Sequence, residues 1–279
     1  MNGKKREFYT IEGMGICCSI SLYYIIYKGD VYVATTLNAK IEGYHVQPDR
    51  KIKTSALLRL FQKSAALDLE NFKISDVDMH NNNVAFVLSR MTVQMYNDIY
   101  FDDVITIKTY PRNLRGAAFI RDYAVYRGDE LCCYCSSSWA IINTETRRLL
   151  RPDALEKFGK LVVSDENMME LPVMRKKIDD SSLFRTYVHT VPYSQLDVNN
   201  HLNNTYYADM IFDGLEPELH SSDAKMYIEI NYRSEAVIGN KLVVSYYDAG
   251  NGDIEISCHN DNKNDVCFTA YLSINGLKS

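Results

Sequence analysis

An acid, an imidazole and several amides lie within eight positions of the second half of the chain. The stretch from Tyr193 to Asp213 reads YSQLDVNNHLNNTYYADMIFD and contains Asp197, Asn199, His201, Asn203 and Asn204. An imidazole titrates near neutral pH and a carboxylate can accept a proton, so these residue types suit acid–base catalysis. An amide can orient a carbonyl group or a water molecule.

An apolar helical pattern follows this cluster directly. It predicts a helix over Asn204–Leu215, ended by Gly214 and Pro217. Asn203 or Asn204 suits the N-cap, and for these two residues capping is favoured over catalysis. The free N–H groups and the positive end of the helix dipole would then lie beside the cluster. A site that stabilises a developing oxyanion needs such donors.

The same residues resemble a family signature. The segment DVNNHLNN is similar to the D-x-N-x-H-V-N-N signature of acyl-acyl-carrier-protein (acyl-ACP) thioesterases, a branch of the hot-dog-fold thioesterases. Downstream, YIEINYRSE at Tyr227–Glu235 resembles the family's L-x-Y-R-x-E segment. In the first half, Met91–Ile105, Arg121–Tyr123 and Ser138–Leu149 resemble the family's strand, R-D-W and S-x-W-x-x-M-N-x-x-T-R-R-L blocks. The resemblance runs in order from about Val31 to Ile274 and indicates a bacterial relative of the plant enzymes.

The fold class that follows is α+β. One helix followed by a run of antiparallel strands occurs twice, which fits two sheets, each wrapped on a helix; the resemblance implies the double hot-dog fold. The expected first-half elements are a helix over Thr54–Asp68 and strands over Val84–Val93, Val104–Tyr110, Ala117–Tyr126 and Leu131–Ile142. Those of the second half are the helix Asn204–Leu215 and strands over Met226–Tyr232, Lys241–Tyr247, Asp253–His259 and Val266–Ile274.

Four segments divide the chain. Residues 1–30 form an N-terminal extension: an extra strand, a hairpin ending at 28–30, or a poorly ordered segment. Residues 31–150 form the first repeat, 151–184 a charged linker, and 185–279 the catalytic repeat. The linker suits a strap between similar halves, with a short helix over Asp153–Leu161 as an option.

The two halves differ where the chemistry would take place. The first-half counterpart of DVNNHLNN is roughly Val46–Ser55, VQPDRKIKTS, which retains Asp49 but has no His or Asn. One active site per chain is therefore expected, and the first half is free to form an acyl-chain pocket. The candidate lining residues of that pocket are Leu57, Leu60, Phe61 and Phe86.

The resemblance assigns catalysis to Asp197, Asn199, His201 and Glu235. His201 and Asn199 would polarise the thioester, and Glu235 or Asp197 would activate water; Asp197 could instead hold the loop through backbone N–H groups. Many plant members have a cysteine after the Glu, for which a nucleophilic scheme is proposed. Here Ala236 occupies that position, so water activation is expected.

The expected function is hydrolysis of acyl-ACP, which releases free fatty acid and terminates chain elongation. An acyl-CoA thioesterase of the same fold is one alternative, and a non-catalytic acyl-binding or dehydratase-like hot-dog protein is another. Acidic carrier protein would dock on basic residues despite the net charge of -5. The candidate docking residues are Arg147, Arg148, Arg151, Arg175, Lys176 and Lys177.

Composition fits a soluble globular enzyme. The chain has 279 residues, and its net charge gives no argument for nucleic-acid binding. The seven cysteines are odd in number and irregular in spacing, as free cytoplasmic thiols would be. No zinc spacing, glycine-rich phosphate loop, membrane span or clean signal-peptide pattern occurs. No cofactor, metal or membrane partner is therefore expected, and a homodimer is an open option.

Overall fold

A long antiparallel sheet with helices packed on one face forms the described part of the chain. The computed structural model describes residues 23–28, 31–174, 178–216, 219 and 225–274. The first-half elements are β1 (Tyr23–Lys28), β2 (Val31–Lys40), α1 (Thr54–Asn71), α2 (Asp76–Asn81), β3 (Val84–Met95), β4 (Val104–Pro111), β5 (Phe119–Arg127) and β6 (Glu130–Asn143). Those of the second half are β7 (Leu183–Thr190), α3 (Tyr206–Asp213), β8 (Tyr227–Tyr232), β9 (Lys241–Gly250), β10 (Asp253–Asn260) and β11 (Asp265–Ser273).

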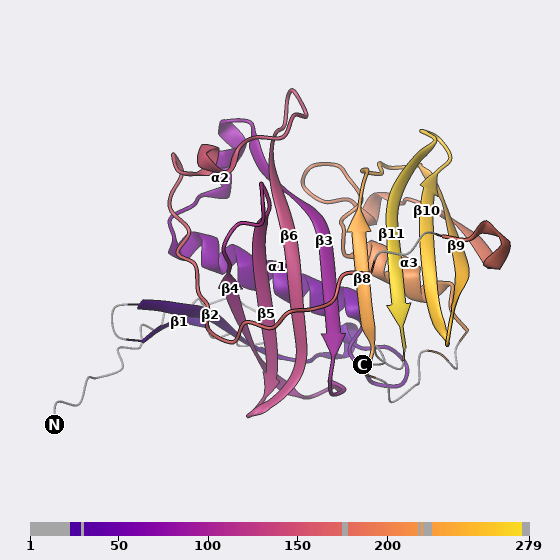
Figure 1. The fold of residues 1–279 in the computed structure, drawn as a ribbon, viewed down its shortest axis with the longest axis horizontal. Helices are drawn as coiled ribbons and strands as arrows, with labels where there is room; N and C mark the ends of the chain where they lie inside the picture. The colour runs from indigo at the N-terminus through magenta and orange to yellow at the C-terminus, as the bar shows by residue number, and fades with distance from the viewer. Residues whose placement is uncertain (1–22, 29–30, 175–177, 217–218, 220–224, 275–279) are drawn as a thin grey trace.

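The sheet contains each half as a separate block of strands. Its order is β1-β2-β4-β5-β6-β3-β8-β11-β10-β9-β7, so the halves meet where β3 pairs with β8 (Figure 1). β6 and β3 precede that junction, and β8 and β11 follow it. A helix-and-sheet unit therefore occurs twice, which confirms the double hot-dog fold expected from the sequence.

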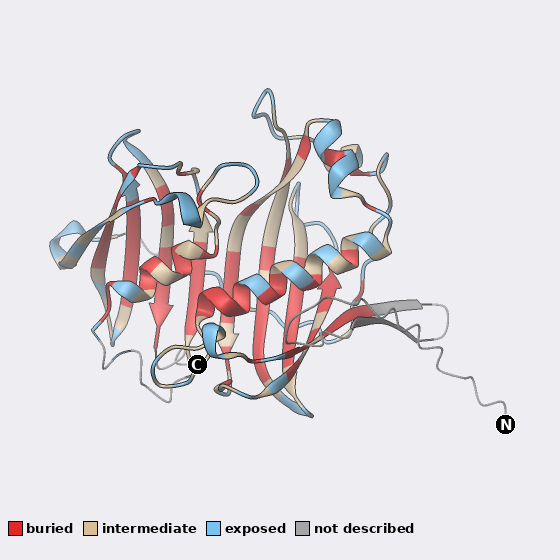
Figure 2. Cartoon of the chain, turned by 180° about the vertical axis from the view of Figure 1, so that it is seen from behind, coloured by how far each residue is buried: buried red, intermediate tan, exposed pale blue. Residues whose placement is uncertain are grey.

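Helices α1 and α3 lie on the same face of the sheet (Figure 2). The apolar side of α1 contributes Leu57, Leu58 and Phe61 to the main core, and the ring of Phe61 stacks on Tyr123 with centroids 4.6 Å apart. Each such side chain stabilises the fold by about 1.5–3 kcal/mol through burial. At the far end of α1, buried Asp68 pairs with Arg121 of β5 at 2.6 Å. This pair fixes the helix against the sheet.

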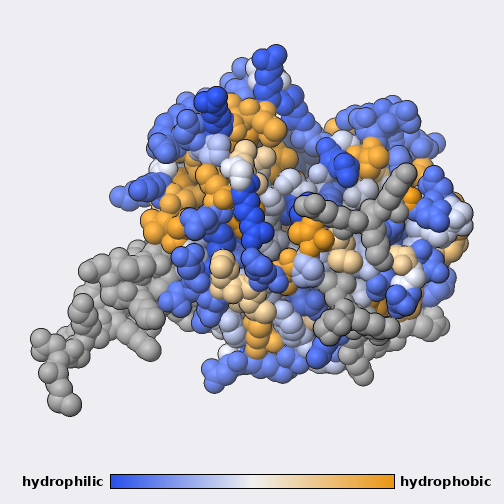
Figure 3. Space-filling model, viewed as in Figure 1, coloured by the Kyte–Doolittle hydropathy of each residue, from blue (hydrophilic) through white to orange (hydrophobic). Residues whose placement is uncertain are grey.

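The connector crosses the opposite face of the sheet (Figure 1). The backbone N–H of Met169 donates to the Tyr134 hydroxyl of the first half at 3.0 Å, and the N–H of Met174 donates to Glu229 of the second half at 3.0 Å. Figure 3 shows this face, where apolar side chains gather near α2 and the start of the connector. They belong to a cluster around Ile74 and Leu155. The connector thus runs as a strap between the halves.

Several element boundaries differ from those expected. The second helix begins at Tyr206 rather than Asn204 and ends at Asp213. The optional short helix over Asp153–Leu161 is only a 3-10 turn over Pro152–Leu155. The sequence pattern predicts no strand at β7, because this edge strand alternates between exposed and half-buried residues and lacks an apolar run. β1 pairs antiparallel with β2, as the hairpin option predicts; residues 1–22 lie outside the described ones.

Two structural findings concern membranes and metal ions. No helix among the described residues is long and apolar enough to cross a membrane. Within the same residues, no group of three or more His, Cys, Asp or Glu side chains is arranged to hold a metal ion.

Candidate active site

The loop before α3 is closed on itself by Asp197. Its backbone N–H donates to the carbonyl of His201 at 2.8 Å, and one oxygen of its carboxylate accepts the N–H groups of Asn199 at 2.8 Å and His201 at 3.1 Å. Asn200 adopts a left-handed φ of 59°, which asparagine tolerates better than most residues. The carboxylate of Asp197 therefore shapes the loop that presents His201 and Asn199, as one of the sequence-based alternatives predicts.

Asn203 and Asn204 have different structural roles. The Asn203 side-chain oxygen accepts the Thr205 backbone N–H at 3.0 Å and its hydroxyl at 2.8 Å, so Asn203 caps the turn that leads into α3. This turn is why the regular helix starts two residues later than expected. The Asn204 oxygen accepts from Gln62 of α1 at 2.6 Å, which ties the loop to the first half.

Glu235 comes to His201 from the loop that follows β8. The backbone N–H of Leu202 donates to the carbonyl of Ala236 at 2.8 Å, which docks the two loops side by side. The Nε2 atom of His201 then lies 3.3 Å from the Oε2 atom of Glu235. The side chains are 26% and 32% exposed, so a substrate can reach both. The two residues are 34 positions apart in the sequence, and the fold brings their side chains into contact.

A cation from the first half, Arg147, also contacts Glu235. Arg147, which follows β6, has a left-handed φ of 58°, and its guanidinium forms an ion pair with the same Glu235 oxygen. The ammonium of Lys263 donates to the backbone carbonyl of Glu235 at 3.3 Å. These two contacts hold Glu235 in place beside His201. The sequence interpretation puts Arg147 on a docking surface and misses this contact, although Arg147 lies in the T-R-R-L block.

Ala236, next to Glu235, is fully buried. A cysteine, Cys267, lies close to the same loop. The carbonyl of Cys267 in β11 accepts the N–H groups of Arg233 and Ser234, so Cys267 adjoins the loop that carries Glu235. A hydrogen bond from the Cys258 thiol lowers the pKa of Cys267 to about 7. Cys267 is nevertheless buried under the strand end rather than open to substrate.

In the second half, backbone hydrogen bonds hold the loop before α3 against the loop after β8, an arrangement called the frame below. The first half repeats this frame with other side chains. The loop at 47–53 matches that at 197–203: Gln47 N–H donates to the Lys51 carbonyl at 3.0 Å, and Ile52 N–H donates to the Ile99 carbonyl at 2.8 Å. Lys51 thereby takes the place of His201, and Asp98 the place of Glu235. Their charged groups form an ion pair with an Nζ–Oδ2 distance of 2.9 Å. The equivalence of Asp98 and Glu235 was readable from the constant spacing to the following strand.

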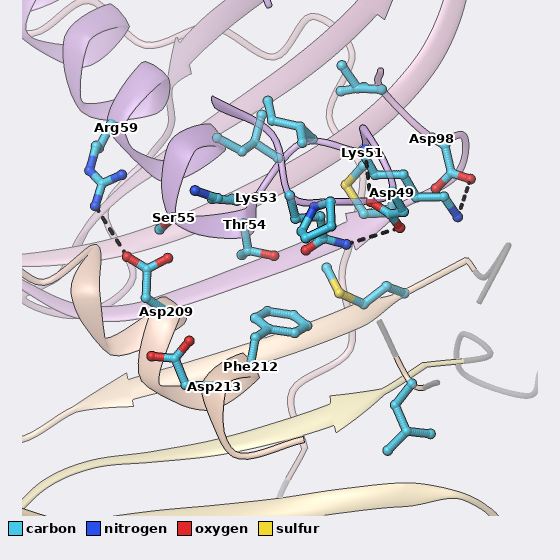
Figure 4. A pocket seen from close by; sticks show the side chains of 18 of the residues that line it. Asp49, Lys51, Lys53, Thr54, Ser55, Arg59, Asp98, Asp209, Phe212 and Asp213 are labelled. Atoms are coloured by element: carbon cyan, nitrogen blue, oxygen red, sulfur yellow. Dashed lines mark hydrogen bonds and ion pairs between the residues drawn. The ribbon is translucent and has the colours of Figure 1, made fainter. Parts of the chain in front are cut away.

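A cleft of about 780 Å³ lies at this first-half frame (Figure 4). None of the four candidate catalytic residues lines it, so this cleft is separate from the contact between His201 and Glu235. Of the expected acyl-pocket residues, Leu57 lines this cleft. Leu60 and Phe61 pack in the main core with Leu57, and Phe86 packs in the separate cluster near α2.

The docking candidates are only partly described. Arg148 and Arg151 are exposed at the start of the connector. Arg175, Lys176 and Lys177 lie outside the described residues.

Comparison with known proteins identifies both halves. Residues 32–155 match the family described as the acyl-ACP thioesterase N-terminal domain, and residues 177–275 match its C-terminal domain. A palmitoyl-acyl carrier protein thioesterase from Arabidopsis thaliana is 26% identical over 240 residues, which are 78% of this chain and 58% of that protein. An acyl-[acyl-carrier-protein] hydrolase from Cuphea viscosissima is 22% identical over 71% of this chain and 51% of its own length. The chain thus spans about half the length of the curated relatives it matches.

Solved structures share the fold. An acyl-ACP thioesterase from Bacteroides thetaiotaomicron aligns with a TM-score of 0.75 at 20% identity, over 85% of this chain and 96% of that one. The 12:0-ACP thioesterase from Umbellularia californica aligns with a TM-score of 0.72 at 20% identity, over 86% and 96% of the two chains.

Proposed function

Because the chain belongs to the acyl-ACP thioesterase family, we propose that it hydrolyses the thioester of acyl-ACP and releases a free fatty acid during fatty acid biosynthesis. The observation that carries this is the contact between His201 and Glu235, which brings together the two signature segments in an accessible loop pair. The relatives named for palmitoyl-ACP and 12:0-ACP hydrolysis support the substrate class.

Water is the nucleophile in this proposal. Its oxygen attacks the carbonyl carbon while its proton passes to Glu235, either directly or through His201. The negative charge on the carbonyl oxygen is stabilised by the amide of Asn199 and by the positive end of the α3 dipole. The carbon–sulfur bond then breaks, the thiolate of the phosphopantetheine arm takes up the proton, and the carboxylic acid is released.

The geometry favours Glu235 over Asp197 as the base. One Asp197 oxygen already accepts two backbone N–H groups, so protonation of that carboxylate would weaken the loop that presents His201. Glu235 instead contacts the imidazole and forms an ion pair with Arg147. A base must accept and return a proton in each cycle without disturbing the loop around it.

A thiol-release assay on hexadecanoyl-ACP and hexadecanoyl-CoA tests the proposal. We expect release from acyl-ACP that depends on His201, with a lower kcat/KM for the CoA thioester. Equal efficiency on both thioesters would assign the chain to acyl-CoA hydrolysis. Absence of release from either, with folded protein, would assign it to a non-catalytic acyl-binding role.

Acidic carrier protein would dock on basic residues of the connector, for which the candidates are Arg148, Arg151 and the sequence run Arg175–Lys177. Oppositely charged patches speed encounter and set partner choice. Reversal of Arg175, Lys176 and Lys177 to Glu should raise KM for acyl-ACP and leave hydrolysis of acyl-CoA nearly unchanged. An equal effect on both substrates would remove these residues from the docking surface.

A further inference from the structure

The cleft beside Lys51 has the size and walls of a lipid site. Its volume of about 780 Å³ falls within the range of about 300–1,000 Å³ for small-molecule sites. One wall is the loop at 47–53 with the first turn of α1, and the facing wall is α3 (Figure 4). Apolar side chains from both halves line the space between them; they include Met95, Ile99, Phe212 and Met226.

Polar donors gather at one end of this cleft because α1 begins without a side-chain cap. Its N-cap is Lys53, which makes no capping hydrogen bond, whereas the equivalent Asn203 accepts from the backbone and hydroxyl of Thr205. Lysine has no acceptor atom, so the hydroxyl of Ser55, the counterpart of Thr205, loses that partner. Ser55 is 1% exposed and lines the cleft, and its hydroxyl has no hydrogen-bond partner.

These donors suit an anion. The helix of 18 residues presents free N–H groups and the positive end of its dipole. The Lys53 ammonium and the Ser55 hydroxyl lie at the same helix end (Figure 4). A carboxylate placed here would accept from all three kinds of donor.

The acidic residues around the cleft are mostly engaged elsewhere. Asp98 pairs with Lys51 at 2.9 Å, and Asp209 pairs with Arg59 at 3.4 Å. Asp49 accepts the Lys51 backbone N–H at 3.0 Å and the Gln47 side chain at 3.2 Å. Asp213 lies on the α3 wall, away from the first turn of α1 (Figure 4). The uncapped helix end is therefore the part of the lining that attracts negative charge.

We propose that this cleft binds a long-chain fatty acid without hydrolysing any bond. The carboxylate lies at the first turn of α1, on Ser55, Lys53 and the free N–H groups. The hydrocarbon chain lies between Met95, Phe212 and Met226. The ligand belongs to the class of the proposed reaction's product, yet the site is separate from His201 and Glu235, so the protein has two lipid sites of different kinds.

A reporter placed in the cleft tests the proposal independently of hydrolysis. The chain has a single tryptophan, Trp139, which does not line the cleft. Phe212→Trp adds a reporter on the α3 wall, and His201→Ala in the same protein removes turnover. We expect hexadecanoate, titrated below its micelle concentration, to change the emission of this protein saturably. The parent with Trp139 alone should show no such change. Absence of a saturable change in the Phe212→Trp protein would overturn the proposal.

Head-group variants separate the site from non-specific lipid binding. Lys53→Gln combined with Ser55→Ala should raise the Kd for hexadecanoate about tenfold or more, since charge-assisted hydrogen bonds are lost. Lys160→Gln removes one exposed charge of the connector and is the matched control, with an unchanged Kd. Hexadecan-1-ol should bind at least about tenfold more weakly than the acid. An unchanged Kd in the double variant, or an alcohol that binds as tightly as the acid, would refute the carboxylate site. Tighter binding of hexadecanoyl-CoA than of hexadecanoate would refute the free acid as its occupant.

Discussion

The loops before α1 and α3 share their backbone hydrogen bonds and differ in the side chains that they present. At the same two positions the first half has Lys51 with Asp98, and the second half has His201 with Glu235. Lysine has an ordinary pKa of about 10.4 and stays charged at neutral pH, so it neutralises its carboxylate permanently. Histidine changes charge near pH 7 and can take part in proton transfer. The fold therefore supplies two equivalent frames, and the residue types decide which one is catalytic.

The largest expected effect separates these frames directly. His201→Ala and Glu235→Ala should each lower kcat/KM on acyl-ACP about a hundredfold or more, the usual range for acid–base groups. Lys51→Ala and Asp98→Ala, at the equivalent first-half positions, should change it less than about threefold, because general acid–base catalysis is lost only where such groups act. Steady-state kinetics on protein with normal circular dichroism makes the comparison. A large loss in the first-half variants would mean that both frames serve the reaction.

Asp197 offers a second contrast, between a base and a structural acceptor. Asp197→Asn keeps a side-chain oxygen for the N–H groups of Asn199 and His201, whereas Asp197→Ala removes it. We expect Asn to retain most activity and Ala to lose about tenfold, with about 0.5–1.5 kcal/mol of stability, since two N–H groups of the loop lose their hydrogen-bond acceptor. Urea unfolding and kcat measure the two effects. If Asn loses as much activity as Ala, Asp197 is the base and Glu235 orients the imidazole.

Arg147 distinguishes the site from the docking surface. Arg147→Met removes the ion pair that holds the Glu235 carboxylate beside His201. We expect kcat to fall several-fold with KM for acyl-ACP nearly unchanged, since a base that is less well positioned transfers protons less efficiently. Arg148→Met is the neighbouring control and should leave kcat unchanged. A change confined to KM for acyl-ACP in both variants would assign both residues to docking instead.

The acyl chain should occupy the first half beside α1, whereas the cleft at 47–53 takes no part in chain-length selection. Leu60→Trp should shift preference toward shorter chains, because a larger side chain on the buried face of α1 shortens the available space. Met226→Trp, in the cleft beside Lys51, should leave the order of chain-length preference unchanged. Rates across acyl-ACPs of increasing length measure both. A preference that follows Met226 would place the substrate chain in that cleft.

The sequence predicts the repeated helix-and-strand pattern because apolar periodicity records burial directly. It predicts His201 and Glu235 because both lie in compact signature segments. It does not predict the contacts of Arg147 or Lys51, since these depend on how separate loops dock in three dimensions. β7 escapes prediction because a half-exposed edge strand carries little apolar periodicity. Phe86 joins a separate cluster from Leu57, Leu60 and Phe61, because strand alternation alone does not say which face packs on α1.

The smallest expected effect concerns Cys267, which adjoins the loop that carries Glu235. Hydrogen bonding from Cys258 lowers the pKa of Cys267, which favours the thiolate form. The sulfur is buried, however, and lies 3.8 Å from the Ser234 hydroxyl rather than beside His201 or Glu235. The first half has Cys132 at the equivalent place, where the carbonyl accepts the N–H groups of Tyr96 and Asn97, so a cysteine here belongs to the frame that both halves share. Cys267→Ala should therefore keep kcat/KM within about twofold while costing some stability through the small cavity that it leaves. A loss of activity as large as that of His201→Ala, in a variant that melts cooperatively near the wild-type temperature, would instead assign a nucleophile to this position.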